Sequence, residues 1–455
     1  MRLLIALTLL MIPLHAARAD GPGMRPNIIF IMADDLGYAD LGCFGQEKIL
    51  TPHIDQLAAE GTRFTQVYAG SSVCAPSRSS LMTGMHNGHN RLRDNIPHGV
   101  FLRPDDVTVG EVLKQAGYAT AAIGKWSLGN PGTWGVANYQ GFDTFFGHLN
   151  QDQAHFYYPD YLWDNDEIML LPKNRGAKTG TYTHDLFTER ALEFIEAKKE
   201  KPFFLYLPYT IPHWSDYPRD TPESQIVPSD APYTDKDWPQ TEKNYAAMVT
   251  RMDRDVGRIA ALVKELGLDS NTLIIFTSDN GPCDTHDHDA DFFNSNGPFN
   301  GYKRDLLEGG LRVPLVARWP GKVSAGATSD QVWTFWDVLP TFAEIAGLPA
   351  PQDIDGISML PTLLGQEQPE SHDYLYWDYG HCRKVYQQAL RMGDWKGIRV
   401  GQNAPIALYD LKTDLGETQD VAAAHPDVVK QIEAHMKAAV TPSPDYPVGE
   451  LYTMK

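Results

Sequence analysis

The stretch Asn27-Ile-Ile-Phe-Ile-Met-Ala33 runs directly into Asp34-Asp35, and it decides the fold. A short uninterrupted apolar run of this kind predicts a β-strand that is fully buried. In an open α/β sheet, ligands bind beyond the carboxyl ends of the strands. The two aspartates therefore mark a candidate site, although on their own they are more typical of a solvated turn.

Strands and helices alternate outward from this run over the first two thirds of the chain. A helix is predicted from Thr51-Pro52 to Gly61, and Thr108 with Glu111 forms the capping box of another. Amphipathic helices are predicted around 187–195 and 245–266, and further strands at 64–69, 119–123, 203–207 and 272–277. Such alternation predicts an α/β sandwich around a central, largely parallel sheet.

The composition of the sequence changes near residue 350, where prolines and turn-forming residues become frequent. Beyond it lie short strand candidates such as 395–400 and one amphipathic helix at about 427–440. A single core usually stops growing near ~250–300 residues, and the chain has 455. We therefore expect one large domain at 20–365 and a smaller C-terminal α+β domain at 366–455.

The first 19 residues predict a signal peptide. Met1-Arg2 is a short positive start, Leu3 to Leu14 is mostly apolar, and Ala17-Arg18-Ala19 fits a cleavage site. The apolar run of 12 residues is well short of the ~20 that span a bilayer. We expect an exported protein, periplasmic or secreted, without a membrane span.

The charge balance excludes one class of partner. Lys and Arg number 39 against 58 Asp and Glu, which gives a net charge of −19. This acidity argues against nucleic acid, which requires a basic face. The four cysteines Cys43, Cys74, Cys283 and Cys382 are too few for a disulfide scaffold, and their spacing matches no zinc site.

Oxygen-bearing side chains follow two of the predicted strands. Asp34-Asp35 ends the first strand, and Asp279-Asn280 follows the strand at 272–277. Three carboxylates in one place would repel one another unless a cation lay among them. Oxygen ligands without a His or Cys set suit Ca²⁺ or Mg²⁺. The acidic segment 283–291 could hold a second metal, but a solvated loop is the favoured reading.

One motif carries a resemblance to a known family. Cys74-Ala-Pro-Ser-Arg78, followed by Leu81-Met-Thr-Gly84, resembles the signature of the formylglycine-dependent (type I) sulfatases, arylsulfatase-like secreted bacterial enzymes of the alkaline-phosphatase-like superfamily. The resemblance continues at Asn27–Asp35, Thr51–Phe64, Gly124–Trp126, Pro212-His213, Asp279–Gly281, Lys303-Arg304, Glu308–Gly310, Arg312–Pro314 and Leu408–Asp410 with Asp414 and Glu417.

The resemblance implies a cofactor set and a mechanism. A maturation enzyme would oxidise Cys74 to formylglycine, and the hydrated aldehyde would complete the shell of one divalent cation, Ca²⁺ in preference to Mg²⁺. The cation ligands would be Asp34, Asp35, Asp279 and Asn280. One gem-diol oxygen would attack sulfur and displace the alcohol, after which the other hydroxyl would expel sulfate.

Basic residues are implied around the same point. Arg78, one helical turn beyond Cys74, would favour an anionic intermediate together with the helix dipole. Lys125 and Lys303 would bind the sulfate oxygens, and His213 would protonate the leaving oxygen. Arg304, Glu308 and Arg312 are expected to be structural partners instead.

One position departs from the family pattern. The family usually has Gly-Lys-Trp-His-x-Gly, with a histidine that serves the elimination step, whereas this chain has Ser127. A serine alone is no base at neutral pH. The role could pass to His155, to a water or to Asp279, and we favour His155.

The expected substrate is a small sulfated saccharide, with galactose- and N-acetylgalactosamine-type glycans as the candidates. Residues 150–163 combine aromatic, amide and charged side chains that suit sugar recognition, although they would equally suit core packing. His155 and Tyr158 lie in this segment. Arg91 and Arg93, with His86 and His89, follow the signature helix and could line the pocket.

Two other functions stay open. The same scaffold could hydrolyse phosphate or phosphonate monoesters, and the serine at 127 leaves room for a protein that only binds sulfated glycans. The acidity of the whole chain predicts moderate capture of small sulfated saccharides by local positive charge and no tight grip on long polymers. No signal for an oligomeric state was found.

Overall fold

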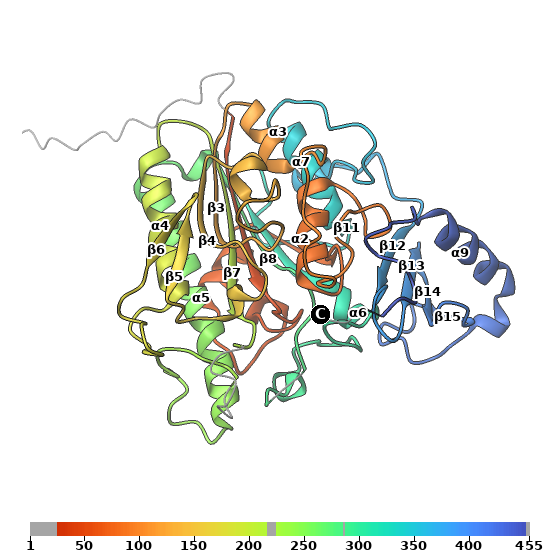
Figure 1. Ribbon diagram of the computed structural model, residues 1–455. Helices are drawn as coiled ribbons and strands as arrows, with labels where there is room; N and C mark the ends of the chain where they lie inside the picture. Colours follow the sequence, from red (N-terminus) through yellow and green to blue (C-terminus); the bar gives the residue numbers. More distant parts are fainter. Residues whose placement is uncertain (1–24, 216–223, 285–286, 452–455) are drawn as a thin grey trace, which may run out of the picture.

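The computed structural model describes residues 25–215, 224–284 and 287–451. The predicted signal peptide at 1–19 lies outside this range. The described chain forms an eleven-stranded sheet and, in the C-terminal part, a separate four-stranded sheet (Figure 1). None of its helices has the length and apolar character that crossing a membrane requires.

The centre of the large sheet is parallel and carries the run that opened the sequence. Its strands are, in spatial order, β8 (Thr272–Ser278), β1 (Asn27–Asp34), β7 (Phe203–Pro212), β3 (Ala119–Lys125) and β4 (Thr144–His148). All eight residues of β1 are buried. The prediction of a fully buried central strand is confirmed.

The flanks of the sheet are mixed. On one side β9 (Arg312–Arg318) runs antiparallel between β8 and β2 (Thr62–Tyr68), and β10 (Ala327–Ser329) and β11 (Trp333–Thr334) pair with β2. On the other side β5 (Tyr161–Asp164) and β6 (Glu167–Leu170) extend the sheet as antiparallel strands. Two reversals at β9 leave β2 parallel to β1, so both strands end at the same edge.

Helices cover both faces of this sheet. One core is formed with α1 (Pro52–Ala59), α4 (Thr183–Lys198) and α5 (Gln240–Glu265), and the other with α2 (Cys74–Thr83), α3 (Val109–Gln115) and α7 (Val338–Ile345). The short helices α6 (Glu308–Leu311) and α8 (Leu360–Leu363) lie in connections. The α/β sandwich is confirmed, and so is the capping box at Thr108.

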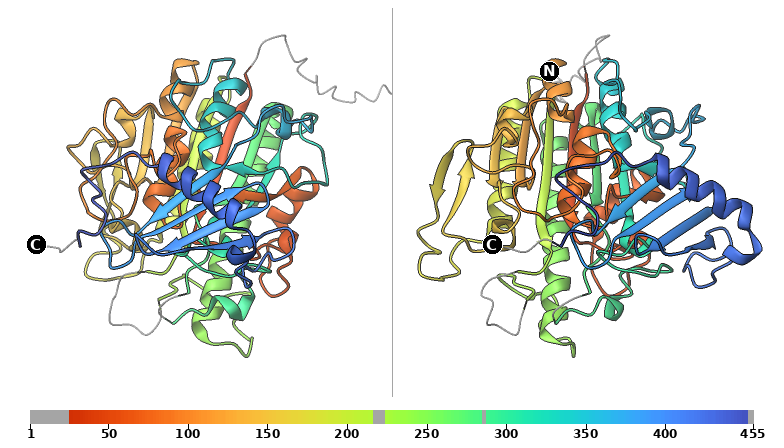
Figure 2. Two further views of the ribbon diagram at one scale, coloured as in Figure 1. Left: turned by 90° about the vertical axis from the view of Figure 1, so that its right-hand side faces the viewer. Right: turned by 45° about the vertical axis from the view of Figure 1, so that its right-hand side comes forward.

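The C-terminal part has its own antiparallel sheet of β12 (Leu375–Tyr379), β13 (Gln387–Met392), β14 (Trp395–Val400) and β15 (Ile406–Asp410). One face packs through Trp377 on Tyr68 and Trp336 of the large unit. The other face is covered by α9 (Pro426–Ala438) (Figure 2). Its buried residues Ile432 and Met436 pack against this face. The expected smaller α+β unit is therefore present.

Strand β9 was not predicted from the sequence. It is buried along its length although it contains Pro314, a residue that normally argues against a central strand. The Pro314 carbonyl accepts a hydrogen bond from the Thr277 hydroxyl at 2.8 Å. Tertiary packing overrides the local signal here.

Candidate active site

Side chains from six segments converge at the carboxyl edge of the large sheet. Asp34 ends β1, Lys125 ends β3, His213 follows β7, and Asp279-Asn280 follows β8. Cys74 is the first residue of α2, and Lys303 lies in the loop before α6. Because β1, β3, β7 and β8 are parallel, their ends meet at one place. All of these side chains are buried.

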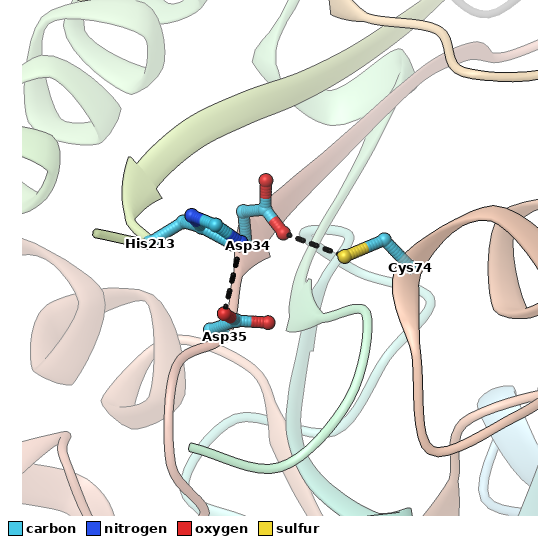
Figure 3. Close-up of side chains that lie close together, drawn as sticks. All are labelled: Asp34, Asp35, Cys74 and His213. Carbon is cyan, nitrogen blue, oxygen red and sulfur yellow. Dashed lines mark hydrogen bonds and ion pairs between the residues drawn. The ribbon is translucent and has the colours of Figure 1, made fainter. Parts of the chain in front are cut away.

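Asp34 lies at the centre of the contacts on one side of the cluster (Figure 3). Its Oδ1 lies 3.3 Å from the Cys74 Sγ, and its Oδ2 accepts a hydrogen bond from the Lys125 Nζ at 2.7 Å. The Arg78 guanidinium lies 3.7 Å away. Burial opposes ionisation of Asp34, but Lys125 and Arg78 outweigh it and hold its pKa well below the usual range.

Arg78 joins two other strand ends. Its Nε and Nη2 donate to the Asp279 Oδ2 at 3.0 and 2.7 Å, and its Nη1 donates to the Lys125 carbonyl at 2.8 Å. Burial and the nearby Asp34 charge nevertheless raise the pKa of Asp279 to about 7. The carboxylates are thus crowded enough for one of them to resist ionisation in the absence of a cation.

Asp35 gathers the other half of the cluster. Its Oδ2 accepts from the Lys303 Nζ at 2.7 Å and lies 3.4 Å from the His213 Nε2. Its Oδ1 accepts from the Asn280 Nδ2 at 2.7 Å. The Asp35 charge outweighs burial and raises the pKa of Lys303 well above its usual value.

One atom of the cluster has no donor. The Asn280 Oδ1 is buried, and nothing in the described chain donates a hydrogen bond to it. Ligating atoms of Asp34, Asp35, Cys74 and His213 all lie within 4.8 Å of one another. Three carboxylates and an unpartnered amide oxygen around one point fit a hard divalent cation. Asp279 is not in this set, but its Oδ1 accepts a hydrogen bond from the Asp35 N–H at 3.2 Å, and the Asn280 Nδ2 donates to Asp35 at 2.7 Å. The four predicted ligands are thus neighbours, and their role stays a prediction.

The thiol of Cys74 is chemically quiet in this setting. Burial and the adjacent Asp34 raise its pKa to about 12. A neutral thiol is a poor nucleophile, so an unmodified Cys74 has little reactivity here. The next residue, Ala75, donates its N–H to the Asn95 Oδ1 at 3.1 Å, which satisfies one of the free N–H groups at the start of α2.

His155 lies at the cluster, whereas the Ser127 hydroxyl makes no hydrogen bond to the described residues of the cluster. The His155 ring stacks on that of His213, with centroids 4.0 Å apart and planes 15° apart. Its Nε2 is 3.4 Å from the Lys125 Nζ. Ser127 has a left-handed backbone with φ of 67°, and its buried hydroxyl has no partner in the described chain.

A recess of about 80 Å³ adjoins the start of α2. Ala75 and Ser127 line it together with the amides of Asn95, Asn150 and Gln151. The Gln151 Nε2 also lies 3.4 Å from the His155 Nε2, so the recess lies next to the cluster. Asn95 was not predicted from the sequence, because it stands in a turn without any local pattern.

The remaining predicted substrate residues lie elsewhere. Arg91 pairs with Asp106 at 2.6 Å, and Arg93 donates to the carbonyls of Asn90 and Thr441. The Tyr158 ring packs on Tyr182 at 5.3 Å. These three side chains therefore make ion pairs, hydrogen bonds and ring contacts with residues outside the cluster. Their substrate contacts stay predictions.

Two further groups of metal-ligating residues are internally paired. Asp355 accepts hydrogen bonds from the backbone N–H of His86 and lies 2.8 Å from the His89 Nδ1. In the acidic segment, His288 lies 2.9 Å from Glu242, and Asp287 accepts from Ser224. The described residues of this segment are thus paired with their neighbours, and the absence of a second metal stays a prediction.

Hydrogen bonds and ion pairs from the large unit and from the smaller C-terminal unit fix the loop that carries Lys303. The N–H of Lys303 donates to the Pro282 carbonyl at 2.8 Å, two residues beyond Asn280. Gly281 allows the close approach, since a Cβ there would lie 1.9 Å from the Gly309 carbonyl oxygen. Farther along the loop, Glu308 meets Lys396 at 2.9 Å and donates its N–H to Glu417 at 2.6 Å. Lys396 also pairs with Glu417 at 2.9 Å.

We call Glu308, Lys396 and Glu417 the junction cluster. Arg312 lies 3.2 Å from Glu308, and the Tyr68 hydroxyl donates to the same carboxylate at 2.6 Å. Glu308 and Arg312 are therefore structural partners, as expected. Lys396 was not predicted, because nothing in a short strand indicates that its lysine is buried.

Comparison with known proteins agrees with this geometry. The family model described as Sulfatase matches residues 26–348, and that of N-sulphoglucosamine sulphohydrolase, C-terminal, matches 297–442. The chain is 30% identical to an N-acetylgalactosamine-6-O-sulfatase of Bacteroides thetaiotaomicron, over 92% of this chain and 93% of that protein. It is 32% identical to human arylsulfatase A, over 92% and 90%.

Solved structures give the same result. The crystal structure of Ps i-CgsB in complex with k-i-k-neocarrahexaose superposes with a TM-score of 0.78 at 29% identity, covering 94% of this chain and 95% of that one. The family match spans the strand-edge cluster and the Cys74–Arg78 motif alike. The chain therefore belongs to the sulfatase family and is a sulfuric ester hydrolase.

Proposed function

We propose that the protein is an exported sulfatase that removes sulfate from a sulfated saccharide, after conversion of Cys74 to formylglycine. The single observation that carries this is the convergence of Lys125, Lys303 and Arg78 with a carboxylate set on the start of α2. Basic side chains in a buried site stabilise an anionic transition state strongly, because no water screens them.

Asp34, Asp35, Asp279 and Asn280 would hold one divalent cation, and Ca²⁺ is favoured because the ligands are oxygens on separate segments. The cation would supply Lewis acidity, and the hydrated aldehyde a nucleophilic oxygen. Lys125 and Lys303, each already paired with one carboxylate, would bind sulfate oxygens. Burial of their ammonium groups makes the attraction larger than at a surface.

Two histidines divide the proton transfers in this proposal. The His213 Nδ1 lies 2.6 Å from the Trp214 carbonyl, which fixes the ring and directs Nε2 into the cluster. From there His213 would serve the leaving oxygen. His155, stacked on it and next to Lys125, would take the elimination role that Ser127 cannot fill.

The relatives support a carbohydrate substrate. One relative is named for N-acetylgalactosamine 6-O-sulfate, and another was crystallised with k-i-k-neocarrahexaose. The amides of Asn95, Asn150 and Gln151 in the recess suit sugar hydroxyls. A galactose- or N-acetylgalactosamine-type sulfated saccharide is the substrate that we propose.

The decisive experiment measures sulfate release from a panel of defined saccharides, each sulfated at one position. Matched aryl sulfate, phosphate and phosphonate esters are assayed alongside. Faster turnover of phosphate or phosphonate esters would overturn the proposal, as would saccharide binding without release of sulfate. Mass measurement of the peptide that contains residue 74 tests formylglycine, since an unmodified thiol in active protein refutes it.

A further inference from the structure

A second recess lies far along the chain from the residues of the active site. It is a groove of about 570 Å³ between α9 and the edge of the small sheet. Helix α9 covers the face of that sheet that points away from the large unit (Figures 1 and 2). The groove is therefore separate from the strand-edge cluster, and no step proposed above uses it.

The charges in the groove are mostly positive. Arg399 comes from β14, and Lys430 and Lys437 come from α9, against a single acidic residue, Glu433. Lys430 and Lys437 are seven residues apart, two helical turns, so they project from one face of α9. Both are exposed. A surplus of two positive charges stands out on a chain with a net charge of −19.

Arg399 is also incompletely paired. Its Nη2 donates to the Glu433 Oε1 at 2.5 Å, but its Nε is buried and has no acceptor in the described chain. An unsatisfied buried donor costs free energy unless an incoming group accepts from it. Because this Nε has no exposed surface, an anion in the groove would approach instead the 15% of the Arg399 side chain that is exposed.

The rest of the lining suits a sugar ring. Tyr386 and Gln388 line one wall, with 9% and 8% of their surface exposed, whereas the lining residue Met436 is fully buried. The Tyr386 hydroxyl donates inward to Asp378 at 3.1 Å, which fixes the position of its ring. The volume lies within the roughly 300–1,000 Å³ of small-molecule sites, whereas the recess beside Cys74 measures about 80 Å³.

We propose that this α9 groove is an accessory binding site for a sulfated glycan chain. It goes beyond the proposed function, because hydrolysis at residue 74 does not require it. A glycan fits better than nucleic acid, since a few local cations in a groove of this volume can hold one sulfated saccharide unit, whereas the net charge of −19 opposes the far denser charge of duplex DNA more strongly. A chain held here has a raised concentration near the active site.

The test uses the full-length protein with Cys74→Ala, so that binding is measured without turnover. The double variant Lys430→Glu/Lys437→Glu is compared with Lys322→Glu/Lys412→Glu, which alters two exposed lysines elsewhere and changes the net charge equally. The probe is chondroitin sulfate, measured at two salt concentrations, with unsulfated chondroitin and duplex DNA as references. We expect the groove variant to weaken binding about tenfold and to lower its salt dependence, and the control to change it less than twofold.

A second readout uses enzyme with Cys74 intact. The groove variant should keep its kcat/KM on a small aryl sulfate but lose activity on the polymer. Equal losses in both double variants, an unchanged affinity in the groove variant, or DNA binding as tight as that of the sulfated polymer would each overturn the proposal. Failure of the aryl sulfate assay in unmodified enzyme would instead refute the proposed function, so the two failures are distinguishable.

Discussion

The active-site cluster and the junction cluster are two buried groups of charges in one molecule, and they differ in one respect. Both join carboxylates to lysines and arginines from distant segments, and both involve the loop 300–311. In the junction cluster, Glu308 is surrounded by donors from the chain itself. In the active-site cluster, the Asn280 Oδ1 has no donor among the described residues, whereas the Glu417 Oε1 of the junction cluster, which also lacks a hydrogen bond, lies 2.9 Å from the Lys396 Nζ.

This difference shows that burial of charge does not by itself mark a catalytic site. A buried ion pair that is complete within the protein stabilises or orients, and its net contribution to stability is small. A set of buried polar groups that lack hydrogen-bond partners within the described chain indicates an additional ligand.

The largest effect is expected at Asp34. Replacement by Asn removes the charge that pairs with Lys125 and Arg78, and it should lower kcat/KM by about 10³-fold or more. The measurement is sulfate release with calcium in excess, together with the calcium content of the purified protein. The exposed Asp330→Asn serves as control. Activity within tenfold of the unmodified enzyme would show that Asp34 is as dispensable as a structural ion pair.

Lys396 should give the next largest effect, on stability. Lys396→Met leaves Glu308 and Glu417 buried without their shared cation, which should cost about 3–5 kcal/mol of unfolding free energy. Urea unfolding monitored by tryptophan fluorescence measures it. Lys412→Met, at an exposed position of the same unit, should cost less than about 0.5 kcal/mol. Similar values for both variants would contradict the assigned role of the junction cluster.

His155 should affect the reaction and not the fold. His155→Ala removes the imidazole beside Lys125 and should lower kcat about 100-fold with little change in melting temperature. Single-turnover kinetics separate the release of the alcohol from the release of sulfate. We expect the slow step to be sulfate release, and unchanged turnover would exclude His155 as the substitute for the missing histidine.

Glu417 should give the smallest effect, visible as a dependence on pH. Burial and the neighbouring Glu308 outweigh Lys396 and raise the pKa of Glu417 to about 7. A carboxyl with a raised pKa in the folded state contributes stability that is complete below its unfolded pKa, near 4.3, and is lost as the pH rises through about 7.

The difference in stability between unmodified protein and Glu417→Gln should therefore shift by about 2 kcal/mol between pH 4.5 and 6.5. Gln does not titrate, so the variant lacks this component of the pH dependence. Urea unfolding at the two pH values measures it. A constant difference would show that Lys396 keeps Glu417 ionised throughout.

Much of this protein follows from the sequence by itself. The run at 27–33 forms a fully buried strand because no polar side chain interrupts it, and Thr108 caps its helix through contacts only three residues away. The aspartates and the Cys74–Arg78 motif were placed at one edge because parallel strands end together. Local patterns suffice wherever the interactions that matter are local or repeated along a strand.

Tertiary structure alone decided the rest. Strand β9 has a paired strand on each side and is fully buried despite Pro314, because both of its neighbours shield it from water. In the sequence, nothing local distinguishes the basic residues Arg91 and Lys396. Arg91 nevertheless pairs with a carboxylate near the surface, whereas Lys396 is fully buried between two carboxylates. The partner of a charge is set by contacts between residues far apart in the chain, and no local pattern records them.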